Sequence, residues 1–425
     1  MLARWLYSTV FYLSIPFLLY RLQQRGKKNP GYLLRKRERF GFYDQAPVTN
    51  SVWVHTVSVG ELIASQPLIE RLLQDYPHLP VVVTTMTPTG SDRVKAAFGD
   101  RVLHVYLPYD LPDAMTRFLN TFNPLVSIIM ETELWPNMIH YTSKRGIPVI
   151  VANARLSENS AKGYSKVSAL TKPMLREISV VAAQATPDGQ RFVDLGLPPT
   201  SLNVTGTVKF DIDVDDTLQQ QAIALRERWG AQRPVFIAAS THEGEDAQVL
   251  KAFKVIRANL DSALLVIVPR HPERFDEVAD LIKLKGWNLS RHSASEPVTA
   301  ETDVVLGDTM GELLILLGAA DVAFIGGSLE PVGGHNMLEA LAVGTPAITG
   351  PHVFNFKVVS DLLEEMGVLL TITTPLGLGM ATLALLQNKQ ERQHLAEEGL
   401  HVVNENRGAM DRLLAIVKRY LPENS

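Results

Sequence analysis

Short, nearly continuous apolar runs that alternate with helical patterns constrain the fold of this chain more than any other feature. In the first half, helical stretches at 62–76 and 112–122 separate apolar runs at 52–55, 81–85, 125–130, 149–152 and 180–183. Strands of this kind are typical of parallel sheets that helices cover on both faces. The first half therefore predicts a doubly wound α/β domain.

The same pattern starts again after a polar stretch, DIDVDDTLQQQ, that begins at Asp211. The second set of apolar runs lies at 235–239, 263–268, 304–306, 322–325 and 347–349. A restart of this kind predicts a second doubly wound domain, which 425 residues can accommodate. The predicted division is a membrane anchor with its basic flank at 1–28, an N-terminal Rossmann-like domain at 29–206, a linker at 207–232 and a C-terminal Rossmann-like domain at 233–425.

The N-terminus carries an uncharged segment of 16 residues, 5–20, which Arg4 and Arg21 bound. As a helix it would be about 24 Å long at ~1.5 Å per residue, slightly short of a bilayer core of ~30 Å. Aromatic residues near its ends suit the headgroup boundary. We interpret it as a membrane anchor. A signal peptide is less favoured, because no small-residue cleavage site follows, and a buried core helix is the other alternative.

Charge is distributed unevenly along the chain. Residues 1–40 contain nine Lys or Arg and one acid, so they carry +8, and the rest of the chain carries −12 of the total of −4. This pattern predicts contact with anionic membrane lipid and a body that stays on the cytoplasmic face. An acidic body also argues against nucleic-acid binding. The chain has no cysteine, which excludes disulfides and thiolate metal sites.

Ligands of open α/β sheets bind at the carboxyl ends of the strands, where this chain is polar and rich in glycine. Glu61 follows the first strand in SVGE, and it is either a general base or a favourable charge in the first turn of a helix that begins near it. Glu131 and Glu133 follow the strand at 125–130 in ETELWPN. One of the two is expected to stabilise charge in a cleft, and the other to build the turn with Trp135.

Two cationic residues are further candidates. Lys209 in VTGTVKFD is either a surface lysine or a cation that reaches a donor phosphate. Pro269 and Arg270 directly follow an apolar run, and an arginine there can bind a phosphate or form a salt bridge at the strand end.

The most specific segment is GGSLEPVGGHNMLE, at 326–339. Its glycines let the backbone approach a ligand, and a helix is expected to open near Asn336, with free N–H groups for an anion and with Glu339 placed for ribose hydroxyls. The alternative is that this glycine-rich segment is a turn without a binding role. In the segment GDTMGEL, Met310, Gly311 and Glu312 are likewise expected at the start of a helix, where they could contact the base or the ribose of a ligand.

Several other chemistries lack their motif. No G-x-G-x-x-G follows the first strand and the chain has no GxxxxGK[ST], so dinucleotide redox chemistry and P-loop hydrolysis are poorly supported. His242 in STHEGED does not form H-E-x-x-H, so a metal site there is disfavoured as well.

Taken in order, the segments SVGE, ETELWPN, NARLS, VTGTVKFD, ASTHEGE, VPRHPERF, DTMGEL and GGHNMLE resemble the 3-deoxy-D-manno-octulosonic acid (Kdo) transferases of lipopolysaccharide synthesis. The resemblance spans nearly the whole chain. It implies a GT-B fold, in which two Rossmann-like domains face each other across a cleft. It further implies transfer of Kdo from CMP-Kdo to lipid IVA at the cytoplasmic face of the inner membrane. The expected reaction inverts the anomeric centre, uses neither metal nor cofactor, and adds two Kdo residues.

The resemblance also implies residue roles. Glu61 would be the proton acceptor, and Glu131 and Lys209 would stabilise the transition state. The CMP moiety would be bound by Pro269, Arg270, Met310, Gly311, Glu312, Asn336, Met337, Leu338 and Glu339. Two alternatives remain open: a GT-B sugar-nucleotide epimerase acting on a soluble substrate, and a non-catalytic sugar-binding protein of two domains.

Overall fold

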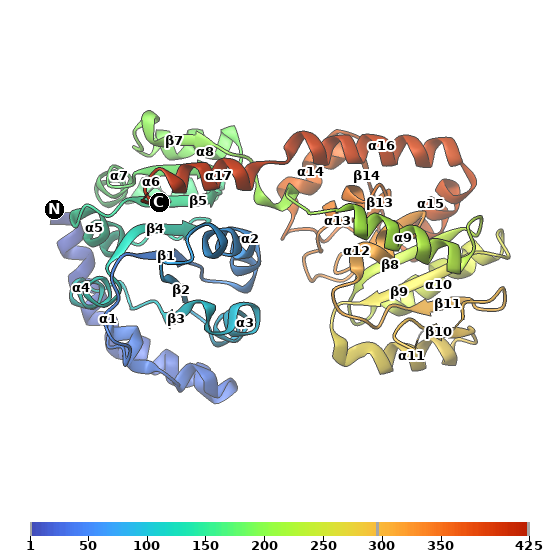
Figure 1. Ribbon diagram of the computed structural model, residues 1–425, viewed down its shortest axis with the longest axis horizontal. Coiled ribbons are helices and arrows are strands. Elements are labelled where there is room, and N and C mark those ends of the chain that lie inside the picture. Colours follow the sequence, from blue (N-terminus) through green and yellow to red (C-terminus); the bar gives the residue numbers. More distant parts are fainter. Residues whose placement is uncertain (1, 295–296, 423–425) are drawn as a thin grey trace. The chain divides into compact units, whose positions relative to one another are not determined.

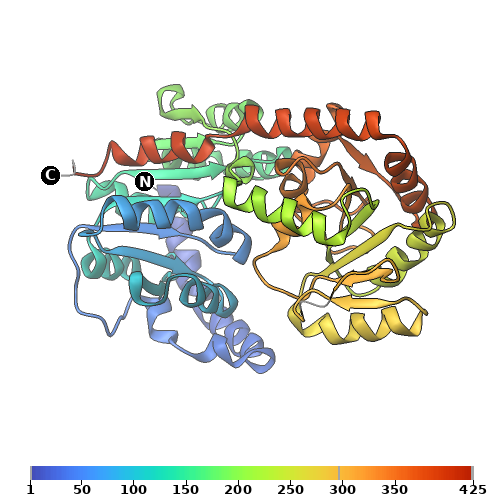
Figure 2. The same ribbon diagram turned by 45° about the vertical axis from the view of Figure 1, so that its right-hand side comes forward.

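The structure is a computed structural model that describes residues 2–294 and 297–422. It divides into two compact units. One unit contains Met1–Asp211 together with Arg407–Ser425, and the other contains Ile212–Asn406. Each unit is built on a parallel sheet of seven strands with helices packed against it (Figures 1 and 2).

The sheet of the first unit has the order β3-β2-β1-β4-β5-β6-β7. Its strands are β1 (Ser51–His55), β2 (Val81–Thr85), β3 (Leu103–Tyr106), β4 (Pro124–Met130), β5 (Val149–Ala154), β6 (Val180–Ala183) and β7 (Leu202–Val204). The helices are α1 (Leu2–Lys28), η1 (Pro30–Leu33), η2 (Lys36–Phe40), α2 (Val59–Asp75), α3 (Pro88–Phe98), η3 (Gly99–Arg101), α4 (Pro112–Phe122), α5 (Pro136–Lys144), α6 (Glu158–Lys166), α7 (Ser168–Leu175), α8 (Thr186–Asp194), η4 (Pro199–Ser201), η5 (Val208–Phe210) and α17 (Ala409–Lys418).

The second unit repeats this plan, with the strand order β10-β11-β9-β8-β12-β13-β14. Its strands are β8 (Val235–Thr241), β9 (Leu264–Pro269), β10 (Leu289–Arg291), β11 (Val304–Leu306), β12 (Val322–Ile325), β13 (Ala347–Thr349) and β14 (Leu369–Thr371). The helices are α9 (Asp216–Trp229), α10 (Glu245–Arg257), η6 (Pro272–Arg274), α11 (Phe275–Leu284), α12 (Leu313–Gly318), α13 (Leu338–Ala342), α14 (Lys357–Glu365), α15 (Pro375–Gln387) and α16 (Lys389–Asn406).

Hydrophobic cores on both faces of each sheet explain the apolar runs of the sequence. In the first unit, Val52 and Val54 of β1 belong to one core, while Trp53 between them belongs to the core on the opposite face. Alternate residues of a strand point to opposite faces, so a strand buried on both sides has to be apolar throughout. The prediction of two doubly wound α/β domains is confirmed.

The units differ from the predicted ranges at two places. The predicted C-terminal domain ran to the end of the chain, but α17 belongs to the first unit, where Leu413 and Val417 join the core beside α2. The predicted linker at 207–232 contains α9, a helix of 14 residues that buries Ala222, Leu225 and Trp229 within the second unit. The polar start of α9 concealed this buried face.

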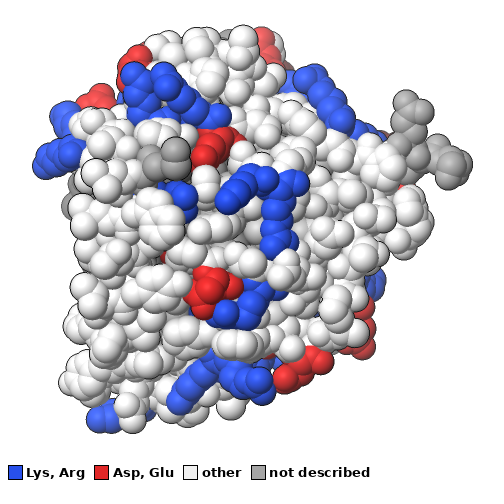
Figure 3. All heavy atoms as spheres, turned by 90° about the vertical axis from the view of Figure 1, so that its left-hand side faces the viewer, with Lys and Arg blue, Asp and Glu red and all other residues white. Residues whose placement is uncertain are grey.

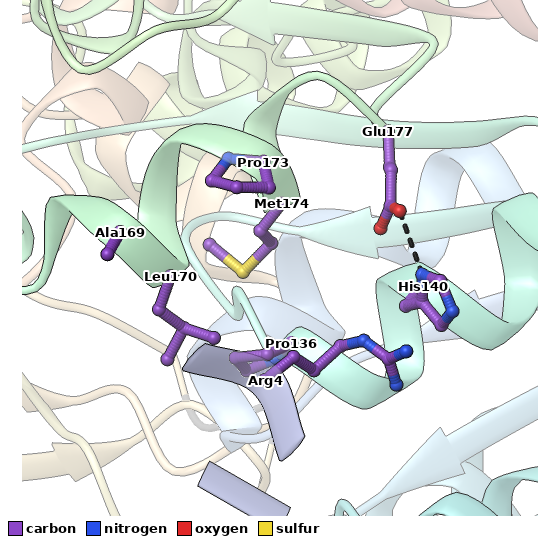
Figure 4. Close-up of a pocket in the computed structure, with 8 residues that line it drawn as sticks. All are labelled: Arg4, Pro136, His140, Ala169, Leu170, Pro173, Met174 and Glu177. Carbon is purple, nitrogen blue, oxygen red and sulfur yellow. Dashed lines mark hydrogen bonds and ion pairs between the residues drawn. The ribbon is translucent and has the colours of Figure 1, made fainter. Parts of the chain in front are cut away.

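The N-terminal helix α1 is long and apolar enough to cross a membrane, and only 6% of its most apolar window is buried. Polar contacts nevertheless hold its first half against the first unit. Ser8 and Arg4 both bond to the side chain of Asn137 on α5, at 3.1 and 3.3 Å. Figure 4 shows Arg4 among residues of α5 and α7, next to the ion pair between His140 and Glu177.

The other side of α1 is open and apolar. The exposed large hydrophobic residues of α1 are Leu2, Trp5, Leu6, Val10, Tyr12, Leu13, Phe17, Leu19 and Tyr20. Figure 3 views the molecule from the side on which α1 lies in Figure 1, and uncharged side chains predominate there, with groups of Lys and Arg among them. A helix that is polar toward its own domain and apolar toward solvent is suited to lie along a membrane surface.

Candidate functional site

Glu61 lies in the first turn of α2, next to the carboxyl end of β1. Ser58 caps this helix, and its hydroxyl donates to Glu61 Oε1 at 2.8 Å while the backbone N–H of Val57 donates to Oε2 at 2.7 Å. Ser58 and Glu61 form a complete capping box. The helix begins at Val59, two residues before the position expected from the sequence. Glu61 therefore has the structural role that was the alternative to catalysis, and the cap also fixes the position of its carboxylate.

The electrostatic surroundings of Glu61 suit proton transfer as well. Burial raises the pKa of Glu61 to about 7, and the neighbouring carboxylates Glu131 and Glu133 add to the shift, against the hydrogen bonds from Val57 and Ser58. A carboxyl group with a pKa near neutrality is about half deprotonated at neutral pH and can accept a proton. The capping and the acid–base roles are thus compatible.

Glu131 and Glu133 follow β4, the strand that pairs with β1 where the strand order reverses. Glu131 has a φ of +58°, which is rare for a residue with a side chain and marks a sharp turn at the strand end. Glu133 accepts a hydrogen bond of 2.9 Å from the indole of Trp135, just before α5. Of the two acids, Glu133 thus builds the turn.

Lys209 lies in η5, after the edge strand β7. Burial lowers its pKa, whereas Glu131 favours the charged ammonium and Arg155 opposes it. These interactions place Lys209 near Glu131. The structure therefore brings Glu61, Glu131 and Lys209 together at the carboxyl edge of the first sheet, although they are far apart in the sequence.

In the second unit, Pro269 ends β9, and the backbone N–H of Arg270 donates to the carbonyl of Thr241 at 3.0 Å. Glu339 is nearby: burial raises its pKa, while a hydrogen bond from Asn336 and the charge of Arg270 lower it. Arg270, Asn336 and Glu339 thus form one polar group at the carboxyl edge of the second sheet. The helix expected to open near Asn336 instead begins at Leu338 and has five residues, so its N-terminus is a weaker anion site than predicted.

Met310, Gly311 and Glu312 form the loop before α12. Gly311 has a φ of +87°, which favours glycine, and Met310 is 65% exposed. The carboxylate of Glu312 lies 3.2 Å from His292. This loop leaves Met310 on the surface of the unit, available for contact with a ligand.

The glycine-rich loop that follows β12 is held by a buried acid, Glu245, at the start of α10. One of its oxygens accepts the backbone N–H groups of Ser328 and Leu329, both at 2.9 Å. The other oxygen of Glu245 accepts the backbone N–H groups of Gly327 at 2.6 Å and His242 at 2.9 Å. Sequence reasoning did not identify this role.

Three histidines gather beside Arg270, and sequence reasoning did not predict that they form one cluster. His242 and His335 approach to 2.8 Å between their Nε2 atoms, and the rings of His242 and His271 lie 5.3 Å apart. Burial, the neighbouring histidines and Arg270 lower the pKa of His335 to about 3. His242 and His271 lie just after strand ends, and this shared position could have been noticed in the sequence, whereas His335 lies ten residues beyond β12. Among the described residues, no group of three or more His, Asp or Glu is arranged to hold a metal ion.

Comparison with known proteins gives one consistent result. Residues 35–212 match the family model described as 3-deoxy-D-manno-octulosonic-acid transferase (kdotransferase), and residues 235–402 match that of glycosyl transferases group 1. The 3-deoxy-D-manno-octulosonic acid transferase of Bordetella pertussis is 36% identical over 90% of each chain. A putative UDP-N-acetylglucosamine 2-epimerase from Listeria monocytogenes shares the fold, with a TM-score of 0.56 at 14% identity over 89% of this chain and 98% of its own.

The 3-deoxy-D-manno-octulosonic acid transferase of Haemophilus influenzae is similar along its entire length. It is 46% identical to this protein over 424 residues, which are 99% of each chain. The motifs, the two parallel sheets and this identity agree, and the chain belongs to the Kdo transferases, the glycosyltransferases that act in lipopolysaccharide biosynthesis.

Proposed function

We propose that this protein transfers Kdo from CMP-Kdo to lipid IVA, with inversion at the anomeric carbon and without a metal ion, and that it adds two Kdo residues. The observation that carries the proposal is the group formed by the buried Glu61 and the partly buried Glu131 and Lys209 at the carboxyl edge of the first sheet. The epimerase alternative rests on fold likeness alone and is not favoured, because the relatives in sequence are transferases.

In the proposed reaction, a hydroxyl of the acceptor attacks the anomeric carbon of Kdo from the face opposite the CMP phosphate. The new carbon–oxygen bond forms as the bond to the phosphate oxygen breaks. The hydroxyl proton passes to Glu61, and CMP leaves with the bonding electron pair. Glu61 suits the task because its pKa of about 7 allows it to accept a proton near neutral pH.

Positive charge develops on the sugar and negative charge on the leaving phosphate as this reaction proceeds. We assign charge stabilisation to Glu131 and Lys209, whose partly buried setting strengthens electrostatic interactions. We assign binding of CMP to the second unit. Arg270 would bind the phosphate, Glu339 would accept ribose hydroxyls, and the remaining contacts would come from Pro269, Met310, Gly311, Glu312, Asn336, Met337 and Leu338.

We further propose that α1 holds the enzyme at the cytoplasmic face of the inner membrane. Its exposed apolar side would enter the lipid boundary, and the net charge of +8 on residues 1–40 would attract anionic headgroups. The polar contacts of Ser8 and Arg4 with Asn137 favour a helix that lies along the surface over one that spans the bilayer.

The test of the proposed function is direct. The purified protein is incubated with lipid IVA and CMP-Kdo, and the lipid product is weighed by mass spectrometry. We expect a mass increase of two Kdo residues, and the same yield with a chelator present. An unmodified lipid would refute the acceptor assignment, a different mass increment would correct the number of residues added, and loss of product with chelator would refute metal independence.

The rate of transfer should depend on pH through Glu61. A proton acceptor has to be deprotonated, so kcat/KM should be constant above the pKa of about 7 and should fall tenfold per pH unit below it. The measurement is a series of initial rates across the neutral range, at acceptor concentrations below KM. A rate that is flat down to the ordinary pKa of glutamate would contradict the assignment of Glu61.

A further inference from the structure

The first unit contains a pocket that no part of the proposed mechanism uses. It lies beside the second half of α1, which contributes Arg21 and Arg25, and Arg39 of η2 also lines it. Apart from Thr87, the rest of the lining is apolar or aromatic: Leu18, Leu22, Tyr32, Val57, Met86, Tyr109 and Trp135. Three arginines among apolar side chains are suited to an anion that is attached to an apolar molecule.

Arg39 is the part of this pocket that is most informative about a ligand. It is only 2% exposed, and its Nε has no hydrogen-bond partner among the described residues. Its terminal nitrogen donates to the carbonyl of Met86 at 3.3 Å, and its guanidinium lies over the ring of Tyr106. A buried arginine that lacks part of its hydrogen bonding is costly unless a ligand supplies an acceptor.

The positive charge of the pocket is not neutralised by the described part of the chain. Arg21, Arg25 and Arg39 form no salt bridge within residues 2–294 and 297–422. The nearest acid in the sequence, Glu38, is already bound by Arg35 at 2.6 Å and by the backbone N–H of Tyr106 at 2.8 Å. The pocket therefore keeps a net positive charge that an anion can balance.

The position of the pocket connects it to the proposed proton acceptor. Val57 lines the pocket, and the backbone N–H of the same residue donates to Glu61 Oε2 at 2.7 Å. Trp135 lines it as well and bonds to Glu133. Val57 thus contacts both the pocket and the carboxylate that would take the proton of the acceptor hydroxyl.

We propose that Arg21, Arg25 and Arg39 bind a phosphate monoester of the acceptor lipid, carried by the sugar whose hydroxyl receives Kdo. This inference rests on the proposed function, since it presumes a lipid acceptor. The phosphate places the hydroxyl beside Glu61, and α1 serves both as membrane contact and as one wall of the acceptor site.

The test compares two acceptors in detergent micelles: lipid IVA, and lipid IVA from which the phosphate on the accepting sugar has been removed. Wild-type protein should lose about 10- to 100-fold in kcat/KM on the dephosphorylated lipid, as expected for one or two charge-assisted hydrogen bonds. The double variant Arg21→Gln/Arg25→Gln should lose a similar factor on lipid IVA and show little further loss on the dephosphorylated lipid. The KM for CMP-Kdo should not change.

The matched control is Lys27→Gln/Lys28→Gln. It removes the same charge from the same end of α1, but neither residue lines the pocket. We expect it to keep the wild-type ratio between the two acceptors. Both double variants alter exposed residues, and a melting temperature within the error of wild type checks their fold.

The possible results distinguish a failure of the proposed phosphate site from a failure of the proposed transfer to lipid IVA. If wild-type protein modifies neither lipid, the proposed acceptor is wrong. If it uses both lipids equally well, or if both double variants lower the ratio alike, the pocket is not a phosphate site and the inference fails. Loss of binding of Arg21→Gln/Arg25→Gln to phosphatidylglycerol vesicles, with an unchanged acceptor ratio, would assign these arginines to bulk anionic lipid and overturn the inference too.

Discussion

The variant Glu61→Gln is expected to lower kcat by about 10²- to 10⁴-fold, the usual contribution of a positioned general base. The affinity for CMP-Kdo should stay unchanged, because the donor residues are assigned to the other unit. Glutamine at this position still completes the capping box with Ser58, so α2 should remain stable. Initial rates of Kdo transfer and calorimetric titration with the donor provide the two measurements.

The control for this prediction is Ser58→Ala, which removes the cap but keeps the carboxylate. It should cost about 1 kcal/mol of stability. It should also raise the pKa of Glu61, because the hydroxyl of Ser58 favours the charged carboxylate, so the pH profile should move to higher pH while turnover at high pH is retained. Wild-type turnover by Glu61→Gln would show that another group accepts the proton.

The variant Glu245→Ala is expected to destabilise the second unit by about 3 to 5 kcal/mol. The carboxylate is fully buried and accepts backbone N–H groups from His242, Gly327, Ser328 and Leu329, and all four would lose their partner. Binding of CMP should weaken as well, because the glycine-rich loop would no longer be held. Urea unfolding, followed together with CMP titration, measures both effects.

A neighbouring acid provides the comparison for Glu245. Glu243 is exposed, and Glu243→Ala should change the free energy of unfolding by less than about 0.5 kcal/mol. Unfolding midpoints that agree between Glu243→Ala and Glu245→Ala would show that the buried carboxylate does not organise the loop.

The sequence predicted the central strands of both sheets and missed the outer ones. The missed strands are β3, β7, β10 and β14, which are the four edge strands. Central strands are buried on both faces and appear as apolar runs, whereas β7 reads LNV and β10 reads LSR, with partly exposed residues in each. Position in the sheet decides the apolar character of a strand, and position is known only after folding.

The residues of the candidate site were also predicted only in part. Motifs pointed to Glu61, Glu131 and Arg270 because each follows a predicted strand end, and the carboxyl ends of parallel strands meet at one edge. Lys209 was identified by its segment alone, because the strand before it, β7, was missed. The histidine cluster and the role of Glu245 depend on loops that come together only in three dimensions. The local sequence cannot reveal that Glu245 binds backbone groups more than 80 residues away.

The return of α17 to the first unit has a consequence for the order of folding during synthesis. The second unit is one continuous segment, whereas the first lacks the core residues of α17 until the whole of the second unit has been translated. At about 5 to 20 residues per second, translation beyond Asp211 takes about 10 to 40 s. The second unit can therefore fold on the ribosome before the first unit, which carries α1, has received the helix that completes its core.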